Sequence, residues 1–193
     1  RASGERTTRE TTITVELNLD GRGDCEVATG VGFLDHMLEL LARHAAFDLA
    51  CHAEGDLQVD AHHTTEDVGI VLGQTMSRAL GDKKGITRFA DARVPMEDSL
   101  CALALDVSGR GHLCFSAEFP AHKVGQFDVE LVEEFLRAFC ANAGLNMHVD
   151  VVRGTNTHHV AEAIFKALAR ALREAVRIDP RLADRVPSTK GVL

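Results

Sequence analysis

DAHHTTEDVGI, residues 60–70, and TNTHHVAEAIF, residues 155–165, share one pattern, His-His-x-x-Glu. In each stretch the histidines open an apolar pattern with helical spacing. We expect helices at 62–81, with Gly81 as its C-cap, and at 158–176. A single short motif of this kind is more often a helix cap or a surface feature, but a second copy is much harder to explain in that way. The two stretches therefore indicate an internal repeat.

The segments around the two motifs also repeat in kind and order. TTITVELNLDGRGDCEVATG (11–30) alternates apolar and polar residues and predicts a hairpin that turns at Gly21 and Gly23. DSLCALALDVSG and HLCFSAEF predict a second hairpin in the later part of the chain. Amphipathic helices are expected at 33–47 and 128–144, and each is followed by a strand segment, 47–60 and 145–152. In the helix at 33–47 the expected apolar stripe is Phe33, Met37, Leu40, Leu41 and His44.

The order of strand pair, helix, strand and helix, found twice, predicts an internally duplicated α+β fold. Residues 8–90 would form the first half and residues 91–178 the second. Residues 179–193, DPRLADRVPSTKGVL, lack periodicity and are expected to form a polar tail. A chain of 193 residues is long enough for one compact domain or two small fused halves.

Composition excludes several classes of partner. The net charge of −8 argues against nucleic acid and against an anionic membrane surface. It leaves room for a small anionic substrate, because a local basic pocket can lie on an acidic protein. The five cysteines are scattered, and we expect mostly buried free thiols in a reducing cytoplasm. No apolar run reaches membrane-spanning length, and the core must consist mainly of Leu, Val, Ala and Phe.

The spacing inside each motif suits a metal site. Residues three or four positions apart lie on one helix face, whereas adjacent residues point about 100° apart. One histidine of each pair can therefore join the glutamate while its neighbour reaches elsewhere. His36 lies 26 residues before His62, and Glu134 lies 24 residues before His158, each in the first helix of its half. These two positions are expected to be equivalent.

Eight ligand-type residues result, five histidines and three carboxylates, which is enough for two metals with four protein ligands each. Imidazole and carboxylate without thiolate suit octahedral Mn, Fe, Co or Ni better than structural zinc. The remaining histidines have no partner pattern. Four of them are expected at the surface or in packing roles: His44, His52, His112 and His122. His148 lies in an apolar strand, so a hydrogen-bonded core histidine, or one that supports a metal ligand, is expected there.

A second group of residues suits a phosphate. Guanidinium, ammonium and hydroxyl groups bind phosphate oxygens. The candidates are Arg88, Arg110, Lys166, Ser188 and Lys190. Taken singly, each is ordinary solvated surface, so this pattern alone is a weak signal.

Six stretches together resemble the imidazoleglycerol-phosphate dehydratase family of histidine biosynthesis: FLDHML, DAHHTTEDVGI, RFADARVPM, DVSGR, TNTHHVAEAIFKALARAL and PSTKG. The resemblance covers nearly the whole chain. It implies two halves, each a four-stranded sheet backed by two helices. It also implies two Mn²⁺ ions per active site and a 24-subunit homo-oligomer whose sites are shared between subunits.

The resemblance also assigns roles to residues. The metal ligands would be His36, His62, His63, Glu66, Glu134, His158, His159 and Glu162. The substrate would contact Glu10, Arg88, Arg110, Lys166, Ser188 and Lys190, the last two in the C-terminal tail. The catalytic group would comprise Glu10, His63, His159, Glu66 and Glu162. The sequence departs from the family pattern at Glu134, where many relatives have His, at Leu40, where some have Gln, and at SGRGH, which replaces a Gly-Arg-Pro-aromatic turn.

The implied reaction converts D-erythro-imidazoleglycerol phosphate to imidazole-acetol phosphate and water, through an imidazolate held between two metals. The base would be Glu10 or a metal-bound hydroxide. Two alternatives use the same ligands. A dinuclear metallohydrolase would activate water on an ester. A metal-storage cage would not need Arg88, Arg110 and Lys190 to meet near the metals.

Overall fold

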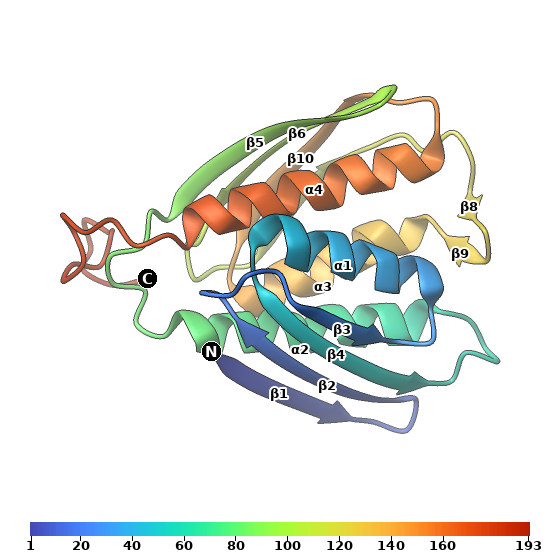
Figure 1. Ribbon diagram of the computed structural model, residues 1–193, viewed down its shortest axis with the longest axis horizontal. Helices are drawn as coiled ribbons and strands as arrows, with labels where there is room; N and C mark the ends of the chain where they lie inside the picture. The colour runs from blue at the N-terminus through green and yellow to red at the C-terminus, as the bar shows by residue number, and fades with distance from the viewer.

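Two four-stranded sheets enclose four helices in the computed structural model, which describes residues 1–193 (Figure 1). The first sheet has the order β1-β2-β4-β3 and the second has the order β5-β6-β10-β7. The strands of the first sheet are β1 (Ala2–Thr7), β2 (Thr11–Asn18), β3 (Cys25–Ala28) and β4 (Asp48–Gly55). Those of the second are β5 (Phe89–Met96), β6 (Ser99–Asp106), β7 (His112–Ser116) and β10 (Asn146–Arg153). The helices are α1 (Gly32–Ala45), α2 (His62–Leu80), α3 (Glu130–Ala143) and α4 (Thr157–Ala175).

The two sheets have the same design, which confirms the internal duplication and the α+β class. In each sheet the second strand pairs antiparallel with both of its neighbours, and the fourth strand in the order pairs parallel at the far edge. The central strands alternate buried and less buried residues because only one face of each sheet meets the helices. In β2 the buried apolar residues are Ile13, Val15 and Leu17, as the sequence pattern predicts.

The hairpins differ from those predicted. β2 and β3 were expected to pair with each other, and so were β6 and β7, but β4 or β10 lies between the members of each pair. The real hairpins are β1–β2 and β5–β6, and neither β1 nor β5 was predicted as a strand. β1 has no apolar alternation, and β5 contains Pro95, which is tolerated because β5 is an edge strand. β1 precedes residue 8, and the expected division at residue 90 falls inside β5. A small hairpin of β8 (Lys123–Val124) and β9 (Phe127–Asp128) precedes α3.

All four helices run in the same direction, so that their N-terminal ends lie together at one end of the molecule (Figure 1). α1 packs against α4, and α2 packs against α3, so each packed pair combines one helix from each half. In the α2–α3 pair, Gly69 faces Phe135 and Ala138, while Gly73 faces Phe139 and Asn142. Without a Cβ at the two glycines, the backbones of the helices can approach closely.

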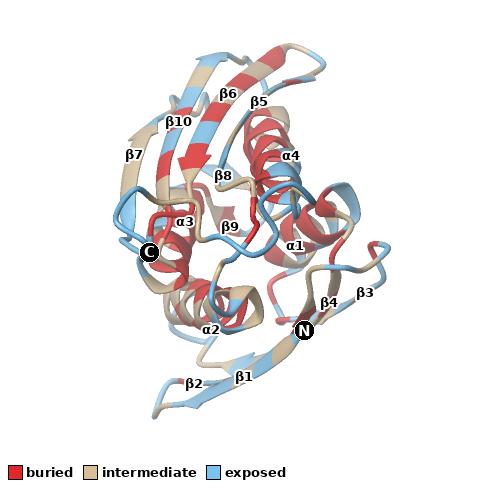
Figure 2. Ribbon diagram, turned by 90° about the vertical axis from the view of Figure 1, so that its left-hand side faces the viewer, coloured by how far each residue is buried: buried red, intermediate tan, exposed pale blue.

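The core lies between the sheets and is formed largely by the helices (Figure 2). It consists mostly of Leu, Val, Ala and Phe, as predicted, and the largest fully buried side chains include Phe135, Phe139 and Phe165. The buried face of α1 is displaced from the predicted stripe. Met37 and Leu41 are buried, as predicted, but Leu34, Leu38 and Ala42 are buried as well. Phe33 and Leu40 are half-buried, and His44 is exposed. α1 meets α4 as well as its own sheet, which moves its buried face toward Leu34 and Leu38.

The end of α2, the cysteines and four of the five unassigned histidines lie where the sequence predicts them. Gly81 is the C-cap of α2, as predicted. All five cysteines are free, and three of them, Cys51, Cys101 and Cys140, are buried. His148 was expected in the core or behind a metal ligand, but it is exposed, because the inward positions of β10 are Met147 and Val149. The other four unassigned histidines are exposed, as expected. None of the helices combines the length and the apolar character needed to cross a bilayer.

Candidate functional site

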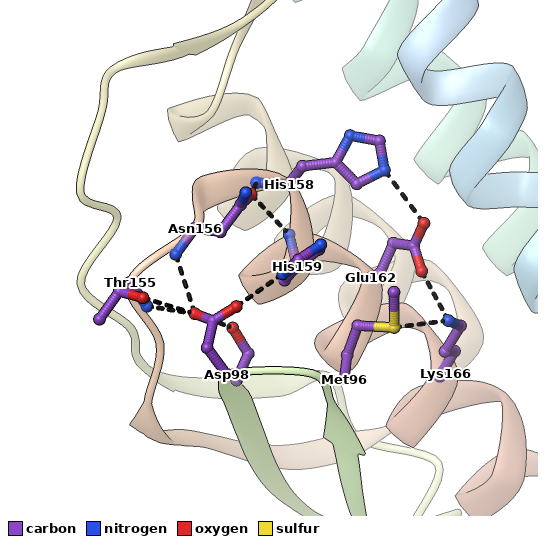
Figure 3. Close-up of polar contacts among 9 residues, drawn as sticks. Met96, Asp98, Thr155, Asn156, His158, His159, Glu162 and Lys166 are labelled. Atoms are coloured by element: carbon purple, nitrogen blue, oxygen red, sulfur yellow. Dashed lines mark hydrogen bonds and ion pairs between the residues drawn. The ribbon is translucent and has the colours of Figure 1, made fainter.

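The start of α4 fixes the second histidine pair. Asn156 is the N-cap, and its side-chain oxygen accepts hydrogen bonds from the backbone N–H groups of His158 at 2.9 Å and His159 at 3.3 Å. This capping holds the first turn of the helix in place. The two imidazole rings leave the turn in different directions, with their planes 80° apart (Figure 3). The divergence predicted for adjacent helical residues is therefore present.

Three predicted metal ligands meet at the N-terminal ends of α1 and α4. His36 Nε2 lies 2.9 Å from Glu162 Oε1, and His158 Nε2 lies 3.0 Å from the same oxygen. The ligand atoms of these three residues all lie within 4.8 Å of one another. His36 comes from the first half of the chain and the other two from the second, so the cluster combines both halves rather than belonging to either.

Glu162 is held as a carboxylate. Its residue is only 7% exposed, and burial by itself would raise the pKa of Glu162. The hydrogen bonds from Lys166, His36 and His158 outweigh burial and lower the pKa to about 2. Lys166 Nζ lies 2.5 Å from Glu162 Oε2 and 3.1 Å from Met96 Sδ (Figure 3). Lys166, predicted to bind the substrate phosphate, is therefore paired with a predicted metal ligand in this structure.

The remaining histidine of each pair is oriented by a carboxylate. His159 Nδ1 lies 2.6 Å from Asp98 Oδ1 (Figure 3), and His63 Nδ1 lies 3.0 Å from Asp56 Oδ2. A carboxylate on Nδ1 leaves Nε2 facing outward as a possible ligand atom. The hydrogen bond to Asp56 raises the pKa of His63. The hydrogen bond from His159, followed by those from Thr155, lowers the pKa of Asp98.

A second predicted set lies on α2 and α3. The rings of His62 and His63 have almost the same relation as the rings of the other pair, with planes 81° apart. Gly69 of α2 faces Ala138 of α3. One helical turn closer to the N-terminal ends lie Glu66 on α2 and Glu134 on α3, so these two glutamates are at the same level of the helix pair. The side chains of His62, Glu66 and Glu134 make no hydrogen bond or ion pair. Arg137, a possible partner of Glu134, pairs with Glu133 instead.

Glu10 lies on the β1–β2 turn, at the same end of the molecule. Asp67 of α2 accepts hydrogen bonds from Arg6 at 2.8 Å and from Thr11, which fastens this hairpin to the helix. Glu10 Oε1 is 3.8 Å from His63 Nε2 and its side chain is half exposed. Glu10 is therefore available to a substrate at the surface beside His63.

Apart from Lys166, the predicted phosphate-binding residues lie at the opposite end of the helices. Arg88 pairs with both carboxylate oxygens of Asp106, at 2.7 and 3.1 Å, and donates to the backbone oxygen of Pro187 at 2.7 Å. It therefore holds the tail segment that carries Ser188 and Lys190. The side chains of Arg110 and Lys190 make no ion pair. The terminal Leu193 lies against Gly109, next to Arg110. The tail therefore brings Ser188 and Lys190 to the same end of the molecule as Arg110.

Within one chain, the two groups of residues are far apart. The backbone N–H of Arg88 donates to Ala175 O at the end of α4, while Glu162 lies in its second turn. At about 1.5 Å per residue, the thirteen residues from Glu162 to Ala175 span roughly 20 Å. Of the predicted phosphate-binding residues, only Lys166 therefore meets the predicted metal ligands inside a single chain, although all of them were expected at one site.

The His36–His158 side of the metal cluster borders a cleft of about 840 Å³. Its walls come from the start of α1, the loop before α2 and the β8–β9 hairpin. Among the lining residues are Phe33, Leu57 and Phe127, which give the cleft an apolar part. Phe33 packs edge-on against the His158 ring, with 5.2 Å between ring centroids. A cleft of this kind can hold a small ring compound beside the histidines.

The donor atoms fit a divalent ion with octahedral preference. Neighbouring donors of such an ion, with bonds of about 2.1 Å, lie about 3 Å apart. The separations of 2.9 and 3.0 Å around Glu162 Oε1 match this spacing. Two imidazoles and a carboxylate without a thiolate suit manganese and related ions. Binding would require the two Nε2 atoms to lose their protons.

Asp56 and Asp98 were not predicted as site residues. Asp56 lies in the loop before α2 and Asp98 in the β5–β6 turn, so neither belongs to the helix that carries its histidine. Both lie in strand-end segments that the fold places beside a helix start. The only signal in the sequence is a carboxylate next to a turn, which is too common to identify a partner.

One enzyme family matches most of the chain. The family model of imidazoleglycerol-phosphate dehydratase matches residues 29–172. The chain is 60% identical over 188 residues to the imidazoleglycerol-phosphate dehydratase of Azorhizobium caulinodans, covering 97% of this chain and 95% of that protein. It is 58% identical to that of Methylorubrum extorquens, over 100% of this chain and 98% of the relative.

Solved structures of the same enzyme share the fold. The dehydratase of Staphylococcus aureus matches with a TM-score of 0.80 and 42% identity, over 92% of this chain and 99% of that one. The Pyrococcus furiosus structure matches with a TM-score of 0.84 and 35% identity, over 98% and 99%. The chain therefore belongs to the imidazoleglycerol-phosphate dehydratase family, the lyases that catalyse this dehydration in histidine biosynthesis.

Proposed function

We propose that this chain dehydrates D-erythro-imidazoleglycerol phosphate to imidazole-acetol phosphate with two Mn²⁺ ions held by its two His-His-x-x-Glu sets. The observation that carries the proposal is the cluster of His36, His158 and Glu162, whose ligand atoms lie within 4.8 Å of one another. It would hold one ion. His62, Glu66 and Glu134 would hold the other. When bound, the two ions would supply Lewis acidity that lowers the pKa of the substrate imidazole and fixes its ring.

Each set supplies three of the four protein ligands expected for its metal, so a further histidine is needed as the fourth. His63 and His159 have their Nδ1 atoms turned toward Asp56 and Asp98, so their Nε2 atoms point away from the sets in their own chain. We propose that each of these histidines completes a set in a neighbouring copy. Symmetric homo-oligomers make such reciprocal contacts common. A homo-oligomer of 24 subunits with shared sites would provide them.

The phosphate group of the substrate would meet Arg110 and Lys190, together with Ser188, in a segment held by Arg88. Because Arg88 is already paired with Asp106 and Pro187, its first role would be to position the tail. This group lies roughly 20 Å from Glu162 along α4, farther than the substrate can reach. The phosphate-binding end of one copy would therefore serve the metal end of another. Lys166, paired with Glu162, would keep that carboxylate charged.

Glu10 would accept the proton that leaves the substrate carbon. Its side chain is exposed, lies 3.8 Å from His63, and sits on a hairpin fastened by Asp67. A general base must stand within reach of the proton it removes, and a rigid hairpin beside a ligand histidine provides that reach. Binding of the remote phosphate would orient the reacting carbons toward Glu10, so that binding energy serves the chemical step.

The experiment is reconstitution of the chelator-treated protein. Anaerobic incubation with Mn²⁺ and imidazoleglycerol phosphate should produce an enolisable ketone, and two metal ions per chain should be bound. Glu162→Gln should lose metal and product together, whereas Glu133→Gln, an exposed change on α3, should keep both. Full turnover by the chelator-treated protein without added metal would refute the proposal.

A further inference from the structure

A second cleft, of about 800 Å³, lies between the last turns of α1 and α4 and the edge strand β5. It is lined by five arginines, one histidine and two carboxylates. The arginines are Arg43, Arg93, Arg170, Arg173 and Arg177. Against Asp91 and Glu174 they leave a net charge of +3 in this cleft, on a chain whose net charge is −8. We infer that this arginine cleft binds a multiply charged phosphate anion at a site distinct from that of the substrate.

The arginines are available to a ligand. Arg177 forms an ion pair with Glu174, with its closest contact at 2.6 Å. The side chains of Arg43, Arg93, Arg170 and Arg173 make no hydrogen bond or ion pair, and all four residues are exposed. Four guanidinium groups without protein partners therefore face one cleft. Each offers a planar pair of donors that matches two phosphate oxygens.

Their positions follow from three elements that the fold brings together. Arg170 and Arg173 lie on one face of α4, at i and i+3, and Arg177 follows just after the end of that helix. Arg93 lies on β5, which packs along α4, and Arg43 lies in the last turn of α1, which packs on the other side. Like charges at helical spacing repel one another. A bound anion would relieve the repulsion among the arginines that converge in this cleft.

Positive charges in and near the cleft act on its histidine in the same direction as burial. Burial, followed by the charges of Lys166 and Arg170, lowers the pKa of His44. Walls of one charge sign concentrate the field inside a cleft and attract counter-ions. The arginine cleft is also separate from the predicted phosphate residues, because none of Arg88, Arg110, Ser188 or Lys190 lines it.

The test uses trimetaphosphate, a cyclic trianion that binds divalent metals weakly, titrated calorimetrically into the metal-loaded assembled protein. The double variant Arg170→Gln/Arg173→Gln should bind it at least tenfold more weakly than the wild type. Arg137→Gln, an exposed arginine on α3 outside the cleft, should bind normally, and so should Arg110→Gln/Lys190→Gln. Affinity should fall as salt is added, since the contacts are electrostatic.

Two outcomes would overturn the inference. Binding that is lost in Arg110→Gln/Lys190→Gln, or unchanged in Arg170→Gln/Arg173→Gln, would place the anion outside the arginine cleft. No binding to the wild type, together with a smaller particle for Arg170→Gln/Arg173→Gln in light scattering, would show that the cleft is covered by another copy of the chain. Activity with imidazoleglycerol phosphate is measured in parallel, so that loss of the dehydratase activity is distinguished from loss of anion binding.

Discussion

At the scale of single residues, Glu134 makes the two predicted metal sets chemically unequal. It occupies the place in α3 that His36 occupies in α1. The first set therefore has two imidazoles and one carboxylate, whereas the second has one imidazole and two carboxylates. A half-buried carboxylate without a hydrogen bond is costly unless a cation neutralises it.

We therefore predict that Glu134→Ala loses about one of the two metal equivalents and most of the activity, whereas Glu134→His keeps both. Imidazole can occupy the same coordination position, so Glu134→His supplies a metal ligand although it removes the negative charge. Metal counting on the purified variants checks this, with Glu133→Ala as the matched control one position away. Two tightly bound ions in Glu134→Ala would make Glu134 a surface residue.

The phosphate-binding residues should be separable from the metal sets. Lys190→Ala or Arg110→Ala is expected to raise the KM strongly while metal content stays full, because both side chains lie at the far end of the helices. Each lost charge-assisted contact corresponds to roughly 1.5–3 kcal/mol, about ten- to a hundredfold. Steady-state kinetics and metal analysis of the same preparations provide the measurement. Unchanged kinetics in both variants would remove these residues from the site.

The candidate metal ligands could be predicted from the sequence more fully than the carboxylates that orient them. The His-His-x-x-Glu spacing predicted that the paired histidines diverge, and His158 and His159 do so. It did not predict that His36 joins the set from the other half, because that depends on α1 packing against α4. Nor did it predict Asp56 and Asp98, whose link to the histidines exists only once sheet and helix are in contact.

At the scale of elements, the α2–α3 contact depends on two glycines. A Cβ at Gly73 would lie 2.7 Å from the backbone oxygen of Phe139 and 2.9 Å from Asn142 Cβ. We predict that Gly73→Ala destabilises the protein by about 1–3 kcal/mol, because two backbones must move apart. Thermal unfolding should show a Tm lower by several degrees. Gly32→Ala is the control, since a Cβ there meets nothing within 4 Å, and an equal loss in both variants would contradict the close packing.

The β2–β3 connection should be sensitive to acid through Asp48. Asp48 Oδ1 accepts the backbone N–H of Arg22 at 2.7 Å, and Oδ2 accepts Asn18 Nδ2 at 2.9 Å. These bonds, that of Arg22 first, lower the pKa of Asp48 below its ordinary value of 3.8. A lowered folded-state pKa stabilises the protein above the ordinary value, and the effect is lost as the pH falls through the lowered one.

Wild type should therefore be more stable than Asp48→Asn above about pH 4, and the difference should shrink at lower pH. Urea midpoints of the two proteins, measured from neutral pH down to about pH 3, check this. A difference that stays constant over the whole range would mean that ionisation of Asp48 is not the cause.

The helices could be predicted from the sequence better than the strand pairing. All four helices lie within two residues of their predicted bounds, because apolar spacing and Gly81 or Gly144 mark their limits. The strand order could not be predicted, since β3 pairs with β4 across the whole of α1. β1 and β5 are edge strands with little buried surface, so their sequences carry little alternation.

At the scale of the whole molecule, the parallel helices separate two kinds of chemistry. The predicted metal ligands gather at the N-terminal ends, and the tail, which lies at the opposite ends of the helices in Figure 1, carries two of the predicted phosphate-binding residues, Ser188 and Lys190. The sequence predicted both groups of residues but not the distance between them, which depends on the length of α4 and its direction in the bundle. Family membership decides for the dehydratase over the hydrolase and storage alternatives. The separation explains why a single chain would not form a complete site.

The most direct test of this division is complementation between Glu162→Gln and Lys190→Ala, assayed at a substrate concentration far below the raised KM of Lys190→Ala, where each variant alone is nearly inactive. They are dissociated, mixed in equal amounts and reassembled. If each site takes its metal end and its phosphate end from different copies, random mixing should restore about a quarter of the wild-type activity. The double variant Glu162→Gln/Lys190→Ala, mixed with either single variant, should stay inactive. Mixed particles that contain both single variants, verified by differential tags, and show no recovered activity would contradict a site shared between copies.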